Sequence, residues 1–275
     1  MPPGLYIHIP FCASRCPYCD FAFVVGKTYL ADLYADTVIR EFRARLPEVG
    51  TSPVFETIYF GGGTPSTVPV EVLGRILNVV RTERGVTENA EITAEANPGD
   101  RPRFAALREL GINRLSLGVQ ALDDQALKAL GRLHNAADAE AAFEAARCGG
   151  FQNINLDLIF GIPKQSLEDW LATLDRAIEL HPEHLSIYGL TIEVGTAFGR
   201  RFERGRLSLP SESDQAAMYE AALDRLMNQG YEQYEVSNFA RPGFESRHNL
   251  SYWEGVPYLG IGVSAHSFLN GCRSW

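Results

Sequence analysis

The feature that most constrains the fold of this chain is an alternation of short apolar segments with longer amphipathic ones, repeated six times along the sequence. A short apolar segment between turn residues is typical of a buried strand, and apolar residues at three- and four-residue spacing indicate a helix. The expected strands are residues 5–9, 57–60, 91–95, 114–119, 153–160 and 185–189. The expected helices are residues 28–46, 70–83, 100–110, 123–130 with 136–147, 166–180 and 213–229. Such alternation requires a parallel sheet covered by helices, so the expected class is α/β, and the pattern alone fits both a doubly wound sheet and a barrel.

The composition excludes several classes of protein. Hydrophobic residues make up 45% of the 275 residues and charged ones 21%, which is typical of a globular chain, and the net charge of -9 argues against a nucleic-acid binder. The N-terminus has no basic segment followed by an apolar one, and the longest uncharged stretch, residues 255–272, is rich in glycine and serine. The sequence therefore predicts neither a signal peptide nor a transmembrane segment, and we expect a cytoplasmic protein.

The cysteines indicate a metal site. Cys12, Cys16 and Cys19 lie within eight residues, directly after the first expected strand, whereas Cys148 and Cys272 stand alone. An odd, clustered set is a poor disulfide framework and a good metal site in a reducing compartment. Three thiolates suit a 4Fe-4S cluster with one iron free of protein ligands, and a structural zinc loop is the alternative.

Other polar or flexible residues follow later strands. Gly61, Gly62 and Gly63 come directly after the second expected strand, where a backbone without side chains can approach a ligand closely. Further candidates at strand ends are Glu95, Gln120 and Asp157. Because the carboxyl ends of parallel strands share one edge, we expect these residues to meet the cysteine loop there.

These segments together resemble the radical S-adenosylmethionine (SAM) superfamily. The segment YIHIPFC with its CxxxCxxC spacing, and GGGTP, AEANP, RLSLGVQ, LDLIFGIPKQ and YEVSNFARPG, are similar to one branch of it in content and order. That branch contains the oxygen-independent coproporphyrinogen III oxidases and the related heme chaperones. The resemblance covers essentially the whole chain. It implies a partial (βα)6 barrel of the TIM type, a 4Fe-4S cluster and bound SAM.

The resemblance also assigns residues. Cys12, Cys16 and Cys19 would hold the cluster. The methionine end of SAM would be lined by Gly62, Gly63 and Thr64. The other SAM-contacting positions would be Tyr6, Glu95, Gln120, Arg132 and Asp157. A carboxylate such as Asp157 is a suitable partner for ribose hydroxyls, and Arg132 for a carboxylate.

Three features favour the chaperone over the oxidase. One is that only four residues precede Leu5, where the oxidase carries an N-terminal arm before the first strand. In the oxidase another cysteine follows the third cluster cysteine after one residue, where this chain has Phe21, and the segment HNLSYW beginning at His248 resembles a motif associated with heme binding. We therefore expect a heme chaperone in which His248 binds heme for delivery to acceptor proteins, some of which could lie at the membrane. The alternatives are an oxidase that decarboxylates coproporphyrinogen III, and a non-catalytic zinc-binding module.

The resemblance divides the chain into a radical SAM core, residues 1–230, and the start of a C-terminal region, residues 231–275. In the family this second region leads into a separate domain. Because the sequence stops at Trp275 with no solvated tail, we expect it to be a fragment or a truncated product.

Overall fold

The computed structural model describes residues 2–52 and 54–275, and its centre is one large sheet. The order of its strands is β13-β12-β11-β1-β4-β5-β6-β7-β8-β10-β9. Strands β11, β1 and β4 to β8 are parallel to one another, and β9, β10, β12 and β13 add antiparallel edges. The central strands are β1 (Gly4–Ile9), β4 (Phe55–Gly62), β5 (Val86–Ala96), β6 (Arg114–Gln120), β7 (Ile154–Phe160) and β8 (His184–Gly189). The α/β class with six consecutive parallel strands is confirmed.

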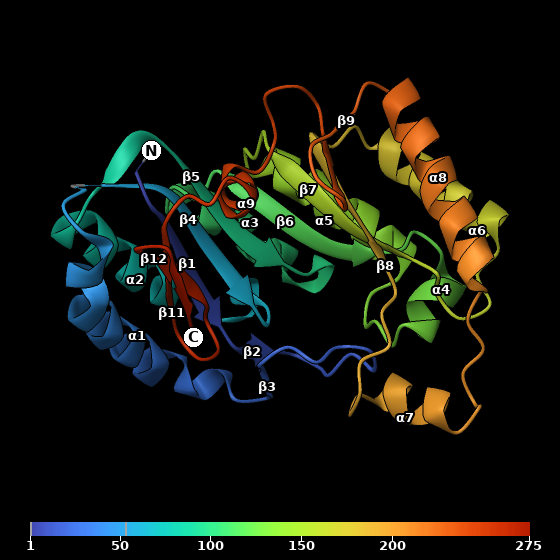
Figure 1. Cartoon of the computed structure of the whole chain (residues 1–275), viewed down its shortest axis with the longest axis horizontal. Helices are drawn as coiled ribbons and strands as arrows, with labels where there is room; N and C mark the ends of the chain where they lie inside the picture. Colours follow the sequence, from blue (N-terminus) through green and yellow to red (C-terminus); the bar gives the residue numbers. More distant parts are fainter. Residues whose placement is uncertain (1, 53) are drawn as a thin grey trace.

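The helices follow the strands in the expected order. They are α1 (Ala31–Arg45), α2 (Val70–Glu83), α3 (Phe104–Glu109), α4 (Asp124–Ala129), α5 (Ala136–Cys148), α6 (Leu167–Glu179), α7 (Ala197–Glu203), α8 (Glu212–Asn228) and α9 (Arg247–Trp253). Figure 1 shows α1 and α2 at one side of the sheet and α6 and α8 at the other. Ser166 caps α6 as expected, since its side chain accepts a hydrogen bond from the backbone of Asp169. The helix expected over residues 100–110 begins instead as a 3-10 helix, Pro98–Arg103, because its two prolines interrupt regular backbone hydrogen bonding.

The two faces of the sheet differ. On β5 the residues Ile92 and Ala94 join the apolar core formed with the helices, whereas the alternating residues Glu91, Thr93 and Glu95 are polar. Because successive side chains of a strand point to opposite faces, the polar residues line the inside of the partial barrel. The short apolar segments predict buried strands. The strands are buried, but their inner face is polar, and it provides the side chains from which a binding site can be built.

The segment after residue 230 joins both edges of this sheet. Its strands are β9 (Glu232–Gln233), β10 (Asn238–Ala240), β11 (Tyr258–Ile261), β12 (Ser267–Leu269) and β13 (Cys272–Ser274). Strand β10 pairs with β8 at one edge, and β11 pairs with β1 at the other. In Figure 1 the red strands β11 and β12 lie beside the blue β1, so the beginning and the end of the chain are neighbours.

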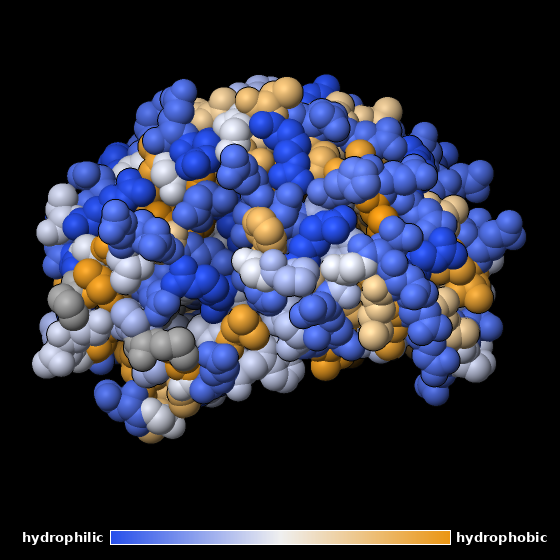
Figure 2. Space-filling model, turned by 90° about the horizontal axis from the view of Figure 1, so that it is seen from above, coloured by the Kyte–Doolittle hydropathy of each residue, from blue (hydrophilic) through white to orange (hydrophobic). Residues whose placement is uncertain are grey.

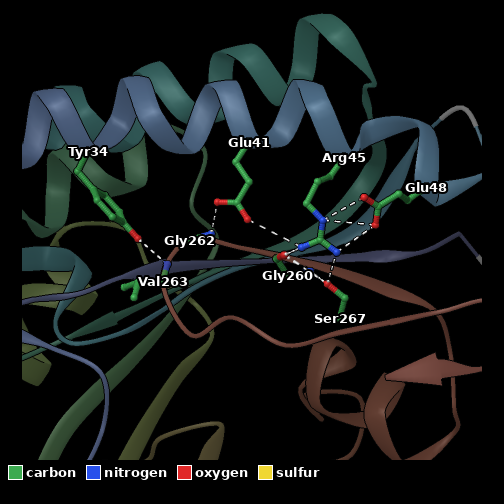
Figure 3. A network of polar contacts seen from close by, with 8 residues as sticks. All are labelled: Tyr34, Glu41, Arg45, Glu48, Gly260, Gly262, Val263 and Ser267. Carbon is green, nitrogen blue, oxygen red and sulfur yellow. Dashed lines mark hydrogen bonds and ion pairs between the residues drawn. The ribbon is translucent and has the colours of Figure 1, made fainter. Parts of the chain in front are cut away.

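Helix α1 holds β11 and β12 in place (Figure 3). Arg45 donates hydrogen bonds from Nη1 to the carbonyl of Gly260, at 2.8 Å, and from Nη2 to Ser267 Oγ, at 3.1 Å. One turn earlier, Glu41 accepts a hydrogen bond from the backbone of Gly262, at 3.0 Å. These contacts join the two ends of the chain by side chains as well as by strand pairing.

Among the described ranges 2–52 and 54–275, no helix is both long and apolar enough to cross a membrane. The face at the amino ends of the strands is mostly hydrophilic, with apolar residues in small separate areas (Figure 2).

Candidate functional site

A cavity of about 900 Å³ opens at the carboxyl ends of the parallel strands. Its volume is within the range of pockets that hold a cofactor or a drug-sized ligand. The predicted residues that line it are Cys12, Cys16, Cys19, Gly62, Gly63, Thr64, Glu95, Gln120, Arg132 and Asp157. Tyr6 and His248, the other two predicted ligand-binding residues, are not part of this lining. The cysteine loop and the strand ends therefore meet at one site, as the parallel topology requires.

The cysteine loop follows β1 and forms one wall of the cavity. Strand β2 (Phe11–Cys12) pairs with β3 (Val24–Val25), which closes the loop at its base, and the Cys19 N–H donates to the Cys16 carbonyl at 3.2 Å. In the part of the chain that the structure describes, no three His, Cys, Asp or Glu side chains converge on the position of a single metal ion. A cluster bonds each thiolate through a different iron atom, so its three cysteines must face one cavity rather than one point.

A chain of polar contacts connects the loop to the strand ends. Arg132 donates from Nη1 to Cys16 Sγ at 3.4 Å, and from Nη2 to the side-chain oxygen of Asn97. Asn97 in turn donates to Thr64 Oγ1 at 2.9 Å, and that hydroxyl lies 3.8 Å from Cys12 Sγ. These contacts hold the cysteine loop at two points, Cys16 and Cys12. Asn97 was not among the predicted residues, and its only sequence signal was its place before a proline in AEANP.

Two carboxyl groups form the floor of the cavity. Glu95 accepts hydrogen bonds from Tyr59 Oη and from the Gly62 N–H, both at 3.0 Å. Asp157 accepts hydrogen bonds from Asn155 at 2.8 Å and from a serine of β6 at 3.2 Å. Burial, and then the neighbouring Asp157 carboxylate, raise the pKa of Glu95 to about 7. Burial also raises the pKa of Asp157. Both carboxyl groups of the floor therefore keep their protons to higher pH than an exposed carboxyl group does.

Backbone geometry shapes two other parts of the lining. Gln120 has a φ of 70°, in the left-handed region that a non-glycine residue rarely adopts. Such strain is often found at functional sites. A Cβ atom at Gly63 would lie 2.8 Å from the carbonyl oxygen of Phe11 and 3.0 Å from Cys12 Sγ. Glycine at position 63 therefore allows the loop after β4 to contact the cysteine loop directly.

Tyr6 and His248 lie on the inner face of the barrel, behind the cavity wall. The ring of Tyr6 stacks on Tyr59, with centroids 6.0 Å apart. The ring of His248 stacks on the same tyrosine at 5.2 Å, and only 1% of His248 is exposed. Both of its ring nitrogens are hydrogen-bonded, Nδ1 with Thr57 Oγ1 at 2.7 Å and Nε2 with Tyr252 Oη at 2.9 Å. Burial, and then the Arg114 guanidinium, lower the pKa of His248 to about 3, so its ring is neutral.

The cavity fits an iron–sulfur cluster and SAM on the chemistry of its own residues. Three thiols share one wall, and the absence of a side chain at Gly63 leaves room beside Cys12. The buried Nε of Arg132 has no hydrogen-bond partner among residues 2–52 and 54–275, so this cation can still bind an acceptor. The floor presents carboxyl oxygens that can accept hydrogen bonds from amino and hydroxyl groups.

Comparison with known proteins identifies the family. The family described as "Radical SAM superfamily" matches residues 6–177. Proteins named "Heme chaperone HemW" from Bacillus subtilis and Escherichia coli are 39% and 41% identical to this chain, over 98% and 97% of its length and 72% and 70% of theirs. The chain belongs to the HemW family of the radical SAM superfamily.

A solved structure agrees with this assignment. Coproporphyrinogen III oxidase (HemN) from Escherichia coli, described as a radical SAM enzyme, aligns with a TM-score of 0.84 at 29% identity. The alignment covers 99% of this chain and 66% of HemN. The resemblance drawn from the sequence motifs is therefore confirmed at the level of fold and family.

Proposed function

We propose that this protein is a heme chaperone of the HemW type that acts in the cytoplasm and delivers heme to acceptor proteins. It would carry a 4Fe-4S cluster and bind SAM. The observation that carries the proposal is the cavity, in which three cysteines face the polar strand ends of a radical SAM barrel. The HemW relatives, similar over nearly the whole chain, support the choice of function.

Cys12, Cys16 and Cys19 would hold the cluster at the cavity wall. In radical SAM proteins the cluster supplies an electron for the cleavage of SAM. Burial raises the pKa of the Cys12 thiol to about 11 and also raises the pKa of Cys19, so cluster assembly must release protons from this loop. Arg132, which donates to Cys16 Sγ, would stabilise that thiolate as a ligand.

The remaining lining would hold SAM. The backbone of Gly62 and Gly63 and the hydroxyl of Thr64 face the methionine end in this proposal, and Tyr6 supports the wall from behind. Glu95 and Gln120 offer acceptors for amino and hydroxyl groups. Arg132 would bind the SAM carboxylate through its donors, and Asp157 would accept hydrogen bonds from the ribose.

Heme binding is assigned to the segment that begins at His248. Tyr252 and Trp253 are 42% and 61% exposed on α9, so their rings can pack on a porphyrin face. A neutral imidazole is the form that coordinates iron. In the described arrangement, coordination by His248 requires that one ring nitrogen gives up its hydrogen bond to Thr57 or to Tyr252 and becomes accessible.

The second candidate is an oxygen-independent coproporphyrinogen III oxidase. The likeness to HemN over 99% of the chain favours it. Against it stands Phe21, which is 65% exposed at the rim of the cavity, in place of the cysteine of the oxidase motif.

Anaerobic reconstitution tests both candidates. We expect a brown protein that contains four irons per chain in a 4Fe-4S cluster, binds SAM and heme, and does not convert coproporphyrinogen III. Cys16→Ser should lose the cluster and keep heme binding, whereas Cys148→Ser, which changes an exposed cysteine outside the loop, should keep both. Turnover of coproporphyrinogen III would refute the chaperone function and support the oxidase. Zinc in place of iron in the cysteine loop would refute both candidate functions.

A further inference from the structure

Helix α9 is fixed to the inside of the barrel at the end opposite the cysteine loop. The carboxylate of Glu91, on β5, accepts hydrogen bonds from the backbone N–H groups of Arg247 and His248, both at 3.0 Å. A carboxylate at this position satisfies N–H groups that have no partner within the helix. The position of α9 is therefore set by the sheet.

The side chain of His248 is held equally firmly. Its two ring nitrogens bond to Thr57 and Tyr252, as described above. The neighbouring backbone of β1 leaves no spare room, because a Cβ atom at Gly4 would lie 2.8 Å from Thr57 Oγ1 and 3.2 Å from the imidazole. The ring thus occupies one defined place against β1 and β4.

Contacts lead from this ring to the cavity. The imidazole stacks on Tyr59 with an interplanar angle of 26°. Tyr59 Oη donates to one oxygen of Glu95, and the other oxygen accepts from the Gly62 N–H. Tyr59, Glu95 and Gly62 line the cavity, whereas His248 supports them from behind.

We propose that His248 is a positioning residue of the SAM cavity, acting through Tyr59 on the carboxylate of Glu95. The inference rests on the proposed binding of SAM, and it is separate from a role of His248 as a heme ligand. Removal of the imidazole leaves a space beside Tyr59, and a tyrosine ring free to tilt into that space no longer holds its hydroxyl at Glu95. SAM then meets a Glu95 carboxylate whose orientation is less defined, and the affinity of the protein for SAM falls.

The pH dependence of SAM affinity distinguishes positioning from general destabilisation. Several titratable groups surround Glu95: Tyr6 on β1, Tyr59 on β4, Asp157 on β7, Tyr188 on β8 and Tyr252 on α9. The Arg114 guanidinium on β6 acts on Tyr59 and Asp157, and the ring of His8 adjoins Gly62. Among these, the hydroxyl of Tyr59 lowers the pKa of Glu95, so loss of that hydrogen bond raises it. The ionised carboxylate is the better acceptor, and SAM affinity should therefore fall as pH decreases through about 7.

The experiment is calorimetric titration of SAM into the anaerobic, cluster-loaded protein between pH 6 and pH 9. Relative to the wild type, His248→Ala and Tyr59→Phe should each weaken binding at pH 8 by about fivefold, the effect of one hydrogen bond, and shift the midpoint to higher pH. His248→Phe keeps a flat ring against Tyr59 and should recover most of the affinity. Glu254→Gln, at the exposed C-terminal end of the same helix, is the control and should match the wild type.

Each outcome is decisive. If the wild type binds SAM and His248→Ala has the same affinity and the same pH midpoint, the positioning role is wrong. If the wild type does not bind SAM, the proposed function fails. In that case a crystal structure of His248→Ala decides the inference, because a Tyr59 ring that keeps its place and its hydrogen bond to Glu95 would refute it.

Discussion

Glu95 offers a direct test of the electrostatics at the cavity floor. In the cluster-free, SAM-free protein, Glu95→Gln replaces an ionisable side chain by a neutral one of nearly the same shape. Glu95 is half-buried, and its neighbour Asp157 carries a like charge whenever both are ionised. Removal of one of the two charges should therefore stabilise the fold wherever Glu95 would otherwise be ionised.

The size and sign of the effect follow from the two pKa values. The pKa of Glu95 is about 7 in the folded protein, against an ordinary value of 4.5. That difference corresponds to about 3 kcal/mol of unfolding free energy, and because water screens a half-buried group we expect about 2 kcal/mol. The folded state holds the Glu95 proton more tightly than the unfolded state does. The contribution of Glu95 to the free energy of unfolding is therefore complete below pH 4.5 and is lost as pH rises through about 7.

The assay is urea unfolding of wild type and Glu95→Gln at several pH values between 5 and 8. The fluorescence of the buried Trp170 reports on the core. We expect the variant to gain stability relative to the wild type as pH rises, by about 2 kcal/mol over this range. Titratable groups that do not interact with Glu95 cancel in the difference, whereas Asp157 contributes through its charge coupling to Glu95. A difference that does not change with pH would show that Glu95 is ionised throughout, and the account of the cavity floor would be wrong.

Two further predictions concern glycine and arginine contacts. Gly63→Ala places a Cβ atom 3.0 Å from Cys12 Sγ, so the reconstituted variant should contain less iron than the wild type. The control is Gly99→Ala, in which the Cβ meets open space at the cavity rim, and it should contain the wild-type amount of iron. Arg45→Met removes the hydrogen bonds from α1 to β11 and β12, and urea unfolding should show a loss of about 1–2 kcal/mol. An unchanged unfolding midpoint would mean that water replaces these contacts at no cost.

The parts of the fold that could be predicted depend on local patterns. Six strands and their helices were predicted because apolar spacing reports which face of an element is buried. The cysteine loop and the strand-end residues were predicted to meet because parallel strands share a carboxyl edge. The structure brings Cys12, Gly63 and Asp157 to one cavity for that reason.

The supporting residues depend on register, which the sequence does not reveal. Tyr59 reaches Glu95 because Tyr59 pairs with Thr93 across β4 and β5, one alternation before Glu95. A slip of one residue would turn Tyr59 to the helix side of the sheet. His248 is held in its buried position by Thr57, which is far away in the sequence. The HNLSYW segment therefore indicated that the imidazole has a function, but it did not indicate where the ring lies.

The same long-range contacts make the barrel depend on the segment that follows it. Without residues 231–275, β1 and β8 would both become open edges with unpaired backbone groups. Inside the barrel, the carboxylate of Glu91 would lose the N–H groups of α9, and a buried charge without partners is costly. Tyr59 would lose the imidazole that packs on it, at the wall of the cavity. The polar inner face that forms the site therefore needs the last segment of this chain in order to be satisfied.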